Sequence, residues 1–403
     1  MTVASKRQLK IMLIAGEESG DQLGYKLMRA LRASCAGDMA FSGIGGFAMV
    51  AEGLETLFAL SDIAVMGFAP VVRRLPTLLR RINETAQACI AARPDALVLI
   101  DAPDFTHRVA RKVRRALPDL PIVDYVSPTV WAWRPGRARK MRGYVSEVLA
   151  LLPFEPAAHL RLGGPPCTYV GHPLVERLAE LRPSAADQAA RLAEPPVLLI
   201  LPGSRRSEIE RLMPVFGHVL RAIVATYGPV EAILPAVDRH VGRIEALVAD
   251  WPVRPRIVLG EAAKFASFRR ARAALAASGT VSLELALAQV PMVIAYKVAK
   301  WEALIARQLV QVATIVLPNL ILGEHVVPEF IQAACNPQNL AGALLPLLQL
   351  SGTRDAQLAG FARLAALMVP DADLAPSDVA ASRVMHWINQ SRQAGPGNSG
   401  QAA

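Results

Sequence analysis

The stretch Leu198-Leu199-Ile200-Leu201-Pro202-Gly203-Ser204-Arg205-Arg206 runs from an apolar segment through a Pro-Gly turn into a basic segment. A segment typical of a helix follows, so the stretch predicts a strand, a tight turn and a helix N-terminus. Glycine lets the backbone approach a ligand closely, and the first N–H groups of a helix lack intrahelical partners. With Ser204 as a hydroxyl and Arg205 as a permanent cation, the turn predicts a phosphate site. The alternative is an ordinary turn with a capped helix and a solvated arginine pair.

The composition favours a large core and an anionic partner. The chain has 403 residues, of which 53% are hydrophobic and 19% are charged, so we expect two domains. The net charge of +10 favours nucleic acid, a membrane surface or a phosphorylated substrate as partner. Nucleic acid is the weakest of these, because aromatic residues are only 5% and no helix-turn-helix, zinc or RNP pattern is present.

The cysteines and the apolar runs indicate a cytoplasmic location. Cys35, Cys89, Cys167 and Cys335 lie far apart without a C-x-x-C pair, which argues against zinc and disulfides and favours thiols in a reducing compartment. The apolar run 11–15 is too short for a signal peptide. Charge-free apolar runs fall short of the roughly 18 residues of a spanning helix, so we expect a soluble or peripheral protein.

The first half alternates apolar runs with helical patterns. Strands are predicted at 11–15, 40–42, 96–100, 121–126 and 148–152, and helices at 22–32 and 108–117. Ser19 or Asp21 is predicted to cap the first helix, and the glycines at 43–46 predict a turn into a helix near Met49. Asp101 and Asp104 follow the apolar run 96–100, at the edge where open α/β sheets bind ligands.

Two stretches of the first half are strongly basic. Residues 63–82 combine four arginines with apolar side chains and no acidic residue, and Pro70 and Pro76 are predicted to break them into short pieces. They suit either the surface of an anionic membrane or a core-packing helix with a wet basic face. Residues 106–143 hold ten Lys or Arg against two Asp, together with Trp131 and Trp133. The alternation of these tryptophans predicts opposite-facing side chains on an extended segment.

The second half repeats the alternation. Strands are predicted at 197–201, 232–234, 256–259, 273–277, 292–295 and near 314–316, and Ser278-Gly279-Thr280 predicts a second phosphate seat. Two consecutive α/β halves predict two Rossmann-like domains facing a cleft. We expect an N-terminal domain at 1–182, a linker at 183–196, a C-terminal domain at 197–355 and a disordered tail at 390–403. Helices at 356–389 are expected either to cross back to the N-terminal domain or to be exchanged in a dimer.

Several motifs together resemble one family in order over about residues 11–340. They are Ala15–Asp21, Ile100–Phe105, Tyr125–Trp133, Leu152–Glu155, Gly171–Pro173, Leu201–Arg205, Ala277–Thr280 and Leu317–Leu320. The chain resembles the lipid-A-disaccharide synthases, inverting glycosyltransferases of GT-B architecture. Ser-Pro-Thr-Val-Trp-Ala-Trp at 127–133 and Asp-Ala-Pro-Asp-Phe at 101–105 are the most specific blocks. Thr106, where the family usually has Asn, and Phe47-Ala48, in place of Pro-Arg, are departures that leave acceptor contacts there open.

The resemblance implies a reaction without a metal or cofactor. A 2,3-diacylglucosaminyl group passes from UDP-2,3-diacylglucosamine to the 6-hydroxyl of 2,3-diacylglucosamine 1-phosphate (lipid X), which gives the β-1,6-linked disaccharide phosphate and UDP. The implied location is the cytoplasmic face of the inner membrane of a Gram-negative bacterium, on an anionic surface, and a homodimer is left open. Another UDP-N-acetylglucosamine transferase or a 2-epimerase is the alternative, and only the first activity requires acylated sugars.

The resemblance also assigns residues to the chemistry. Asp101 matches the catalytic aspartate and is expected to act as base, whereas Asp104 is a second candidate for which a helix-capping role is favoured. Arg205, with Gly203 and Ser204, matches the phosphate-contacting segment. The other expected contacts with the UDP-sugar are Ser278, Gly279, Thr280, Glu284 and Asn319. A solvent-facing charge is the alternative for Glu284, and a turn-forming residue is the alternative for Asn319.

Candidates for the acceptor or sugar lie in the first half. They are Ser19, Asp21, Asp104, Trp133 and Arg134, with helix capping, core packing or a solubilising charge as the alternatives. His172, in Gly-His-Pro, is expected to be structural.

Overall fold

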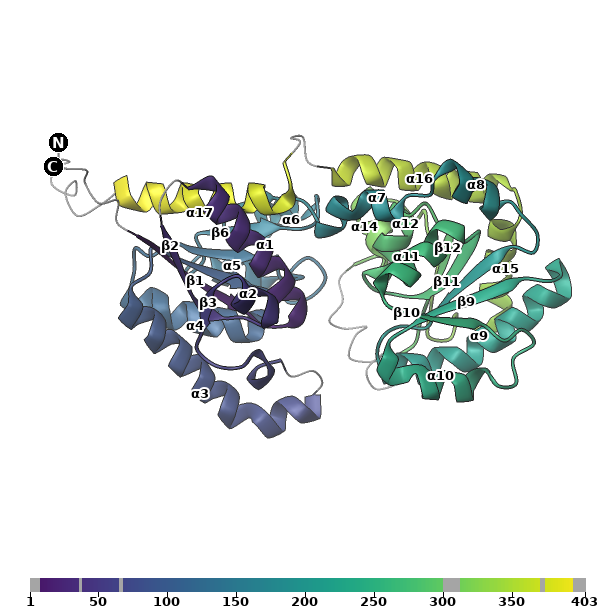
Figure 1. The fold of residues 1–403 in the computed structure, drawn as a ribbon, viewed down its shortest axis with the longest axis horizontal. Helices are drawn as coiled ribbons and strands as arrows, with labels where there is room; N and C mark the ends of the chain where they lie inside the picture. Colours follow the sequence, from purple (N-terminus) through teal and green to yellow (C-terminus); the bar gives the residue numbers. More distant parts are fainter. Residues whose placement is uncertain (1–7, 36–37, 65–67, 300–311, 370–373, 394–403) are drawn as a thin grey trace. The chain divides into compact units, whose positions relative to one another are not determined.

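Each half of the chain folds around its own parallel sheet (Figure 1). The computed structural model describes residues 8–35, 38–64, 68–299, 312–369 and 374–393, and only the backbone of residues 68–73. Unit 1 comprises Met1–Pro173 and Pro370–Ala403, and unit 2 comprises Leu174–Val369. The predicted α/β class with two Rossmann-like domains is confirmed. The first boundary lies at residue 173, and residues 183–196, where a linker is expected, contain a helix of unit 2.

The unit 1 sheet has seven parallel strands in the order β3-β2-β1-β4-β5-β6-β7. Its central strands are apolar throughout because both faces of the sheet are covered by helices. The strand bounds are β1 (Leu9–Ala15), β2 (Met39–Ile44), β3 (Leu54–Thr56), β4 (Ala96–Ile100), β5 (Ile122–Tyr125), β6 (Glu147–Ala150) and β7 (Cys167–Tyr169).

Successive residues of β1 point to two separate cores. Ile11 and Leu13 pack with α1 (Glu18–Ser34) and α17 (Pro376–Gln393), whereas Met12 and Ile14 pack with α3 (Phe68–Ala92) and α4 (Pro103–Ala116) (Figure 1). Shorter elements complete the unit, namely α2 (Phe47–Ala51), η1 (Leu60–Asp62), α5 (Gly136–Met141) and α6 (Glu155–Arg161).

The C-terminal helix α17 is anchored to unit 1 by a buried carboxylate. Arg383 Nη2 lies 2.8 Å from Glu147 Oε1, and Trp387 Nε1 donates to Glu147 Oε2 at 2.7 Å. Of the expected helices at 356–389, α16 (Gly352–Met368) belongs to unit 2 and α17 belongs to unit 1. Helix α17 continues to Gln393, and the rest of the 390–403 tail lies outside the described residues.

The unit 2 sheet has six parallel strands in the order β10-β9-β8-β11-β12-β13. They are β8 (Val197–Leu201), β9 (Glu231–Ala236), β10 (Arg256–Leu259), β11 (Ala273–Ala277), β12 (Met292–Tyr296) and β13 (Glu329–Ile331). Helices α9 (Arg206–Tyr227), α10 (Val241–Val248) and α15 (Pro337–Leu348) pack on one face. Helices α11 (Glu261–Arg270), α12 (Val281–Leu287) and α16 cover the other face (Figure 1). The remaining elements are η2 (Pro173–Arg177), α7 (Leu178–Leu181), α8 (Ala185–Arg191), η3 (Asp238–His240) and α14 (Leu317–Leu322).

Helix α8 holds two helices that follow strands of the unit 2 sheet, α11 after β10 and α12 after β11. The buried guanidinium of Arg191 donates to the carbonyl oxygens of Phe268 and Arg269 at the end of α11, and of Ala288 and Gln289 after α12. Burial lowers the pKa of Arg191 to about 10. Because the last carbonyls of a helix lack intrahelical partners, one buried cation can hold both ends.

Two sequence predictions about local structure are wrong. Residues 314–316 form no strand, because Glu329 Oε2 accepts from the Ile315 amide and Thr314 Oγ1 accepts from the Val316 amide. The basic stretch is not broken into pieces from Phe68 onward, since α3 is continuous with Pro76 inside it. Pro70 is the third residue of α3, where a missing N–H costs no intrahelical bond. Residues 65–67 lie outside the described residues.

Among the helices of the described residues, none combines the length and the hydrophobicity that a membrane-spanning helix requires.

Candidate active site

Both sheets reverse their strand order at one point, and the predicted functional residues lie at those points. The order changes direction between β1 and β4 in unit 1 and between β8 and β11 in unit 2. In open α/β sheets, ligands bind beyond the carboxyl ends of the strands at such a point. Asp101 directly follows β4, Pro202-Gly203 follows β8 and Ser278 follows β11.

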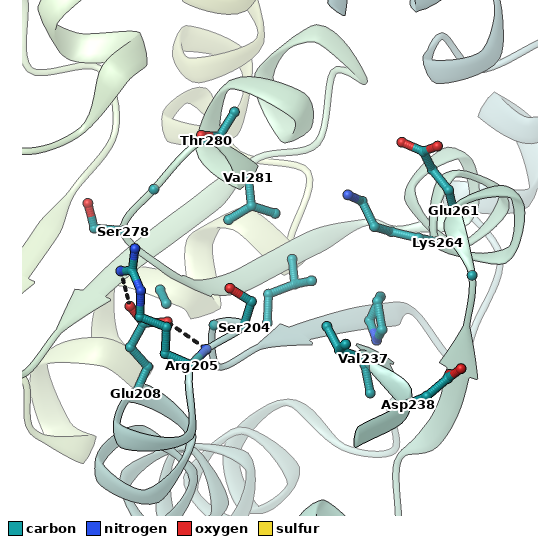
Figure 2. A pocket seen from close by; sticks show the side chains of 17 residues that line it. Ser204, Arg205, Glu208, Val237, Asp238, Glu261, Lys264, Ser278, Thr280 and Val281 are labelled. Carbon is teal, nitrogen blue, oxygen red and sulfur yellow. Dashed lines mark hydrogen bonds and ion pairs between the residues drawn. The ribbon is translucent and has the colours of Figure 1, made fainter. Parts of the chain in front are cut away.

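Unit 2 has a cavity of about 670 Å³ at this edge (Figure 2). Its lining includes six residues that the sequence predicted, namely Gly203, Ser204, Arg205, Ser278, Gly279 and Thr280. It also includes Asp238, Glu261 and Lys264, which sequence reasoning missed. These three follow the carboxyl ends of β9 and β10, so a search of every strand end for charged residues would have found them.

The turn after β8 requires glycine. Gly203 has a φ of +102°, and a Cβ there would lie 2.3 Å from Glu208 Oε2 and 2.9 Å from Glu208 Cβ. The Glu208 carboxylate accepts from the Arg205 amide at 3.2 Å and pairs with Arg205 Nη1 at 2.9 Å. Arg205 is the N-cap residue of α9, so Ser204 precedes the cap and its side chain lines the cavity. The guanidinium of Arg205 is 66% exposed and therefore accessible to a ligand.

The second glycine turn faces the same cavity. Gly279 has a φ of +151° between β11 and α12, and Ser278 Oγ donates to the Ile315 carbonyl at 2.9 Å. Ser278 and Thr280 line the cavity together with the Arg205 turn (Figure 2). Amides, hydroxyls and a guanidinium that converge in this way suit the oxygens of a diphosphate.

Glu284 and Asn319 have different surroundings. The Glu284 side chain is only 13% exposed, and its Oε2 lies 2.7 Å from Lys264 Nζ, so it is not a solvent-facing helix charge. Asn319 is buried, and its side-chain amide donates to the Val327 carbonyl and accepts from the Val327 N–H, each at 2.8 Å. The structure therefore shows Asn319 as a link between α14 and residue 327, outside the lining of the cavity.

Asp101 lies at the switch point of unit 1 on a left-handed turn. Asp101 and Ala102 have φ values of +58° and +46°, and the Asp101 amide donates to the Tyr125 carbonyl of the neighbouring strand at 3.1 Å. Burial raises the pKa of Asp101, and the nearby Asp124 carboxylate raises it further, while the Ala102 N–H bond at 2.7 Å opposes the shift. A rigid carboxylate with a raised pKa is suited to accept a proton from a hydroxyl.

The turn after β1 packs directly against the Asp101 turn. A Cβ on Gly16 would lie 2.0 Å from the Ala102 Cβ, so only glycine fits there. Ser19 is exposed on the first turn of α1, which begins at the same edge of the sheet. The predicted cap is wrong, because Glu17 is the N-cap of α1 and both Ser19 and Asp21 lie inside the helix.

Asp21 instead caps a different helix. Its buried carboxylate accepts from the amides of Gly46, Ala48 and Met49 at 2.7, 2.9 and 3.0 Å, and these amides begin α2. The predicted turn at 43–46 into a helix near Met49 is confirmed. With its oxygens engaged by these amides, Asp21 is placed to hold α2.

The tryptophan block forms a turn, so the prediction of an extended segment is wrong. The amides of Ala132 and Trp133 both donate to the Thr129 carbonyl. Trp133 Nε1 donates to Thr129 Oγ1, and the Arg134 guanidinium lies 4.2 Å from the centroid of the Trp133 ring. The aromatic face therefore supports a cation at the end of the block.

Asp104 pairs with cations and does not cap α4. The helix begins at Pro103 with Ala102 as its N-cap, so the capping interpretation is wrong. Arg137 Nη2 lies 2.6 Å from Asp104 Oδ1, and Arg134 Nη1 lies 3.8 Å from the same oxygen. Two guanidinium groups thus gather around one exposed carboxylate, one helical turn after Asp101.

Buried polar pairs hold this edge of unit 1 and were not found from the sequence. Glu155 accepts from Trp131 Nε1 at 3.1 Å and from the Leu152 amide at 3.0 Å, and burial raises its pKa to about 7. His107 Nε2 lies 2.9 Å from Asp124 Oδ2, and both side chains are 1% exposed. Burial lowers the pKa of His172 to about 4, which agrees with a structural role.

Comparison with known sequences gives one family. A sequence model described as lipid-A-disaccharide synthetase matches residues 11–367. A lipid-A-disaccharide synthase of Rhodopseudomonas palustris (strain HaA2) is 56% identical over 381 residues, which cover 94% of this chain and 97% of the relative. One of Nitrobacter hamburgensis is 54% identical over 389 residues, which cover 96% of this chain and 98% of the relative.

Solved structures share the fold at low identity. Acinetobacter baumannii MurG has a TM-score of 0.57 at 15% identity and covers 94% of this chain and 100% of its own. An S. aureus MnaA–UDP structure has a TM-score of 0.60 at 11% identity and covers 96% of this chain and 97% of its own. At such identities these structures establish the architecture and nothing about the substrate.

Proposed function

The chain belongs to the lipid-A-disaccharide synthase family of glycosyltransferases, and from this premise we propose how its residues carry out the transfer. The proposed donor is UDP-2,3-diacylglucosamine, and the proposed acceptor is the 6-hydroxyl of 2,3-diacylglucosamine 1-phosphate. The observation that carries the proposal is the match to this family over residues 11–367, a range that contains both switch points. Unit 2 binds the nucleotide in this scheme, and unit 1 supplies the base.

The cavity of unit 2 is proposed to hold the diphosphate of the donor. Cleavage of the sugar–phosphate bond leaves negative charge on UDP, and preorganised donors lower the barrier where this charge develops. Gly203 lets the backbone approach the phosphate oxygens, and the exposed Arg205 guanidinium provides a permanent charge. Ser204 and Thr280 add hydroxyl groups on the cavity wall, whereas the hydroxyl of Ser278 donates to the Ile315 carbonyl.

Asp101 is proposed to remove the proton from the attacking hydroxyl. Its burial raises the pKa, so the ionised carboxylate is a stronger base than an exposed aspartate. The left-handed turn and the bond from the Ala102 N–H fix the direction of the carboxylate. With an inverting mechanism, the alcohol attacks from the face opposite to the departing UDP.

We assign the acceptor phosphate to Arg134 and Arg137. Both guanidinium groups lie around Asp104, one helical turn after Asp101. The 6-hydroxyl and the 1-phosphate of the acceptor lie at opposite ends of one sugar ring, so this assignment requires the base and the cations to be separated by about the length of that ring. Trp133 supports Arg134 from its ring face and offers an apolar surface to sugar or lipid.

Contact with an anionic membrane is proposed for α3 of unit 1, at the cytoplasmic face of the inner membrane. Leu75 and Leu79 are each 44% exposed on this helix, and Arg74 and Arg80 beside them are exposed as well. Exposed leucines next to arginines suit a bilayer interface with anionic head groups.

Sedimentation with vesicles of phosphatidylglycerol and phosphatidylethanolamine tests this contact. Replacing Leu75 and Leu79 by Ser is expected to weaken binding by about tenfold or more, because each leucine loses apolar burial. Leu350 and Leu367 of unit 2, 75% and 50% exposed, provide a matched control pair of Ser substitutions. Equal binding of all three proteins would contradict the proposal.

Incubation with UDP-2,3-diacylglucosamine and 2,3-diacylglucosamine 1-phosphate tests the function. Mass spectrometry is expected to show a disaccharide monophosphate, with one UDP released for each disaccharide. UDP-N-acetylglucosamine is the control donor and is expected to give neither product nor epimer. Epimerisation of the control donor without transfer of the acylated sugar would contradict the proposed function.

A further inference from the structure

A lysine lines the nucleotide cavity and points to a role that the family assignment leaves open. Lys264 comes from the first turn of α11, and Arg205 comes from the turn before α9. Figure 2 shows the two cations on different walls, with the Lys264 side chain directed into the cavity.

Lys264 is the partner of a largely buried carboxylate. Lys264 Nζ lies 2.7 Å from Glu284 Oε2, and the two side chains are 26% and 13% exposed. Glu284 Oε2 is nevertheless without a well-directed hydrogen bond among the described residues. The ion pair satisfies the charge of Glu284 but leaves its hydrogen-bonding capacity open, which is costly for a buried oxygen.

The surroundings of Lys264 keep it available to Glu284. The neighbouring Glu261 pairs with Arg177, and Glu208 pairs with Arg205, so both carboxylates have other cationic partners. Lys264 Nζ lies 5.3 and 5.7 Å from the ring centroids of Phe265 and Phe268, and these rings restrict its position.

We propose that Lys264 is a positioning residue that holds the carboxylate of Glu284, which lies beside the cavity lining, in place for the two hydroxyls of a ribose. The inference rests on the proposed function, in which unit 2 binds a uridine diphosphate sugar. A vicinal diol offers two O–H donors, and an ionised carboxylate accepts both. Lys264 thereby makes the cavity selective for ribonucleoside diphosphates over their deoxy analogues, while Arg205 binds the phosphates.

Titration calorimetry on the full chain with UDP and with 2′,3′-dideoxy-UDP tests this role. The wild-type protein is expected to prefer UDP by about tenfold or more, because unpaired polar groups are left in the site when the diol is absent. Lys264→Met is expected to reduce this preference to less than about threefold by weakening UDP binding alone. Glu284→Gln should have the same effect, and the double variant should add little.

A conservative variant and a distant variant distinguish the positioning role of Lys264 from a general loss of structure or charge. Lys264→Arg is expected to restore most of the preference, because it returns the positive charge beside Glu284. Lys112→Met, which replaces an exposed lysine on α4 of unit 1, should leave both affinities unchanged. Thermal unfolding of each variant checks that the fold is retained.

Two results would overturn the inference. If Lys264→Met weakens UDP and the dideoxy analogue equally, Lys264 contacts the phosphates and does not act through Glu284. If wild-type protein binds both nucleotides equally well, the cavity does not recognise ribose hydroxyls, although the proposed function survives. Failure of the wild type to bind UDP at all would instead overturn the proposed function and the inference with it.

Discussion

The switch points of the two units share a topology and differ in what occupies them. In unit 2, the turns after β8 and β11 border a cavity of about 670 Å³. In unit 1, the turns after β1 and β4 touch, since a Cβ on Gly16 would lie 2.0 Å from Ala102. One edge is thus open to a large anion, and the other presents a single half-buried carboxylate.

Glycine explains much of this difference. Gly203 and Gly279 lie directly on the cavity, where the absence of a side chain leaves room for ligand oxygens. At the switch point of unit 1, the turn after β4 has positive φ at Asp101 and Ala102, which carry side chains. The same strand order therefore suits anion binding where the turn after the strand contains glycine, and proton transfer where that turn carries a carboxylate.

The largest expected effect tests whether Asp101 is the base that distinguishes unit 1 from unit 2. Asp101→Asn keeps the shape of the side chain and tolerates a left-handed backbone, so the fold should persist. We expect kcat to fall by about a thousandfold, the middle of the range for loss of a general base, with UDP affinity unchanged. Steady-state kinetics and calorimetry measure the two quantities.

Asp104 provides the discriminating variant for this prediction. It is exposed and paired with Arg137, and Asp104→Asn is expected to change KM for the acceptor more than kcat. A loss of kcat in Asp104→Asn as large as the one expected for Asp101→Asn, with a near-normal Asp101→Asn protein, would move the base to Asp104.

A second, smaller effect is expected in the cavity of unit 2. Arg205→Ala should lower kcat/KM for the UDP-sugar by about a hundredfold, because a charge-assisted contact with the departing diphosphate is lost. Arg206→Ala is the matched control, since Arg206 pairs with Glu210 on the helix surface and lies outside the cavity lining. Equal losses in both variants would indicate a general effect of charge and contradict a specific phosphate seat.

Much of this arrangement follows from local sequence. The bounds of β4, β8, β10 and β11 agree with the predicted strands. Each strand is a run of apolar residues, with Arg256 as the one exception, and each ends at a turn or at a charged residue. The strands β3, β7 and β13 have three residues each and no apolar run to mark them. Their positions depend on pairing with a neighbouring strand, which a local pattern does not encode.

The residues of the candidate site also fall into two groups, those that local sequence predicts and those that depend on contacts between distant segments. The position of Gly203 and Arg205 on the cavity was predictable, because both belong to the turn that follows an apolar strand. Asp21 was not, because its carboxylate meets amides that lie 25 to 28 positions further along the chain. Lys264 was hidden among the ordinary charges of a helix, and its pairing with Glu284 appears only when α11 and α12 lie side by side.

The smallest expected effect concerns the influence of the Asp124 carboxylate on the pKa of Asp101 in unit 1. The Asp124 carboxylate raises the pKa of Asp101, so Asp124→Asn should lower the pKa of the base. Because the base must be ionised, the acid limb of the kcat/KM profile should move to lower pH, with a slightly lower plateau from the weaker base. The amide oxygen introduced by this substitution can still accept from His107 Nε2, so the buried pair at 2.9 Å should keep a hydrogen bond. A pH–rate profile from about pH 4 to 9 measures the shift, and a limb that moves upward or stays in place would show that Asp101 does not set the acid limb.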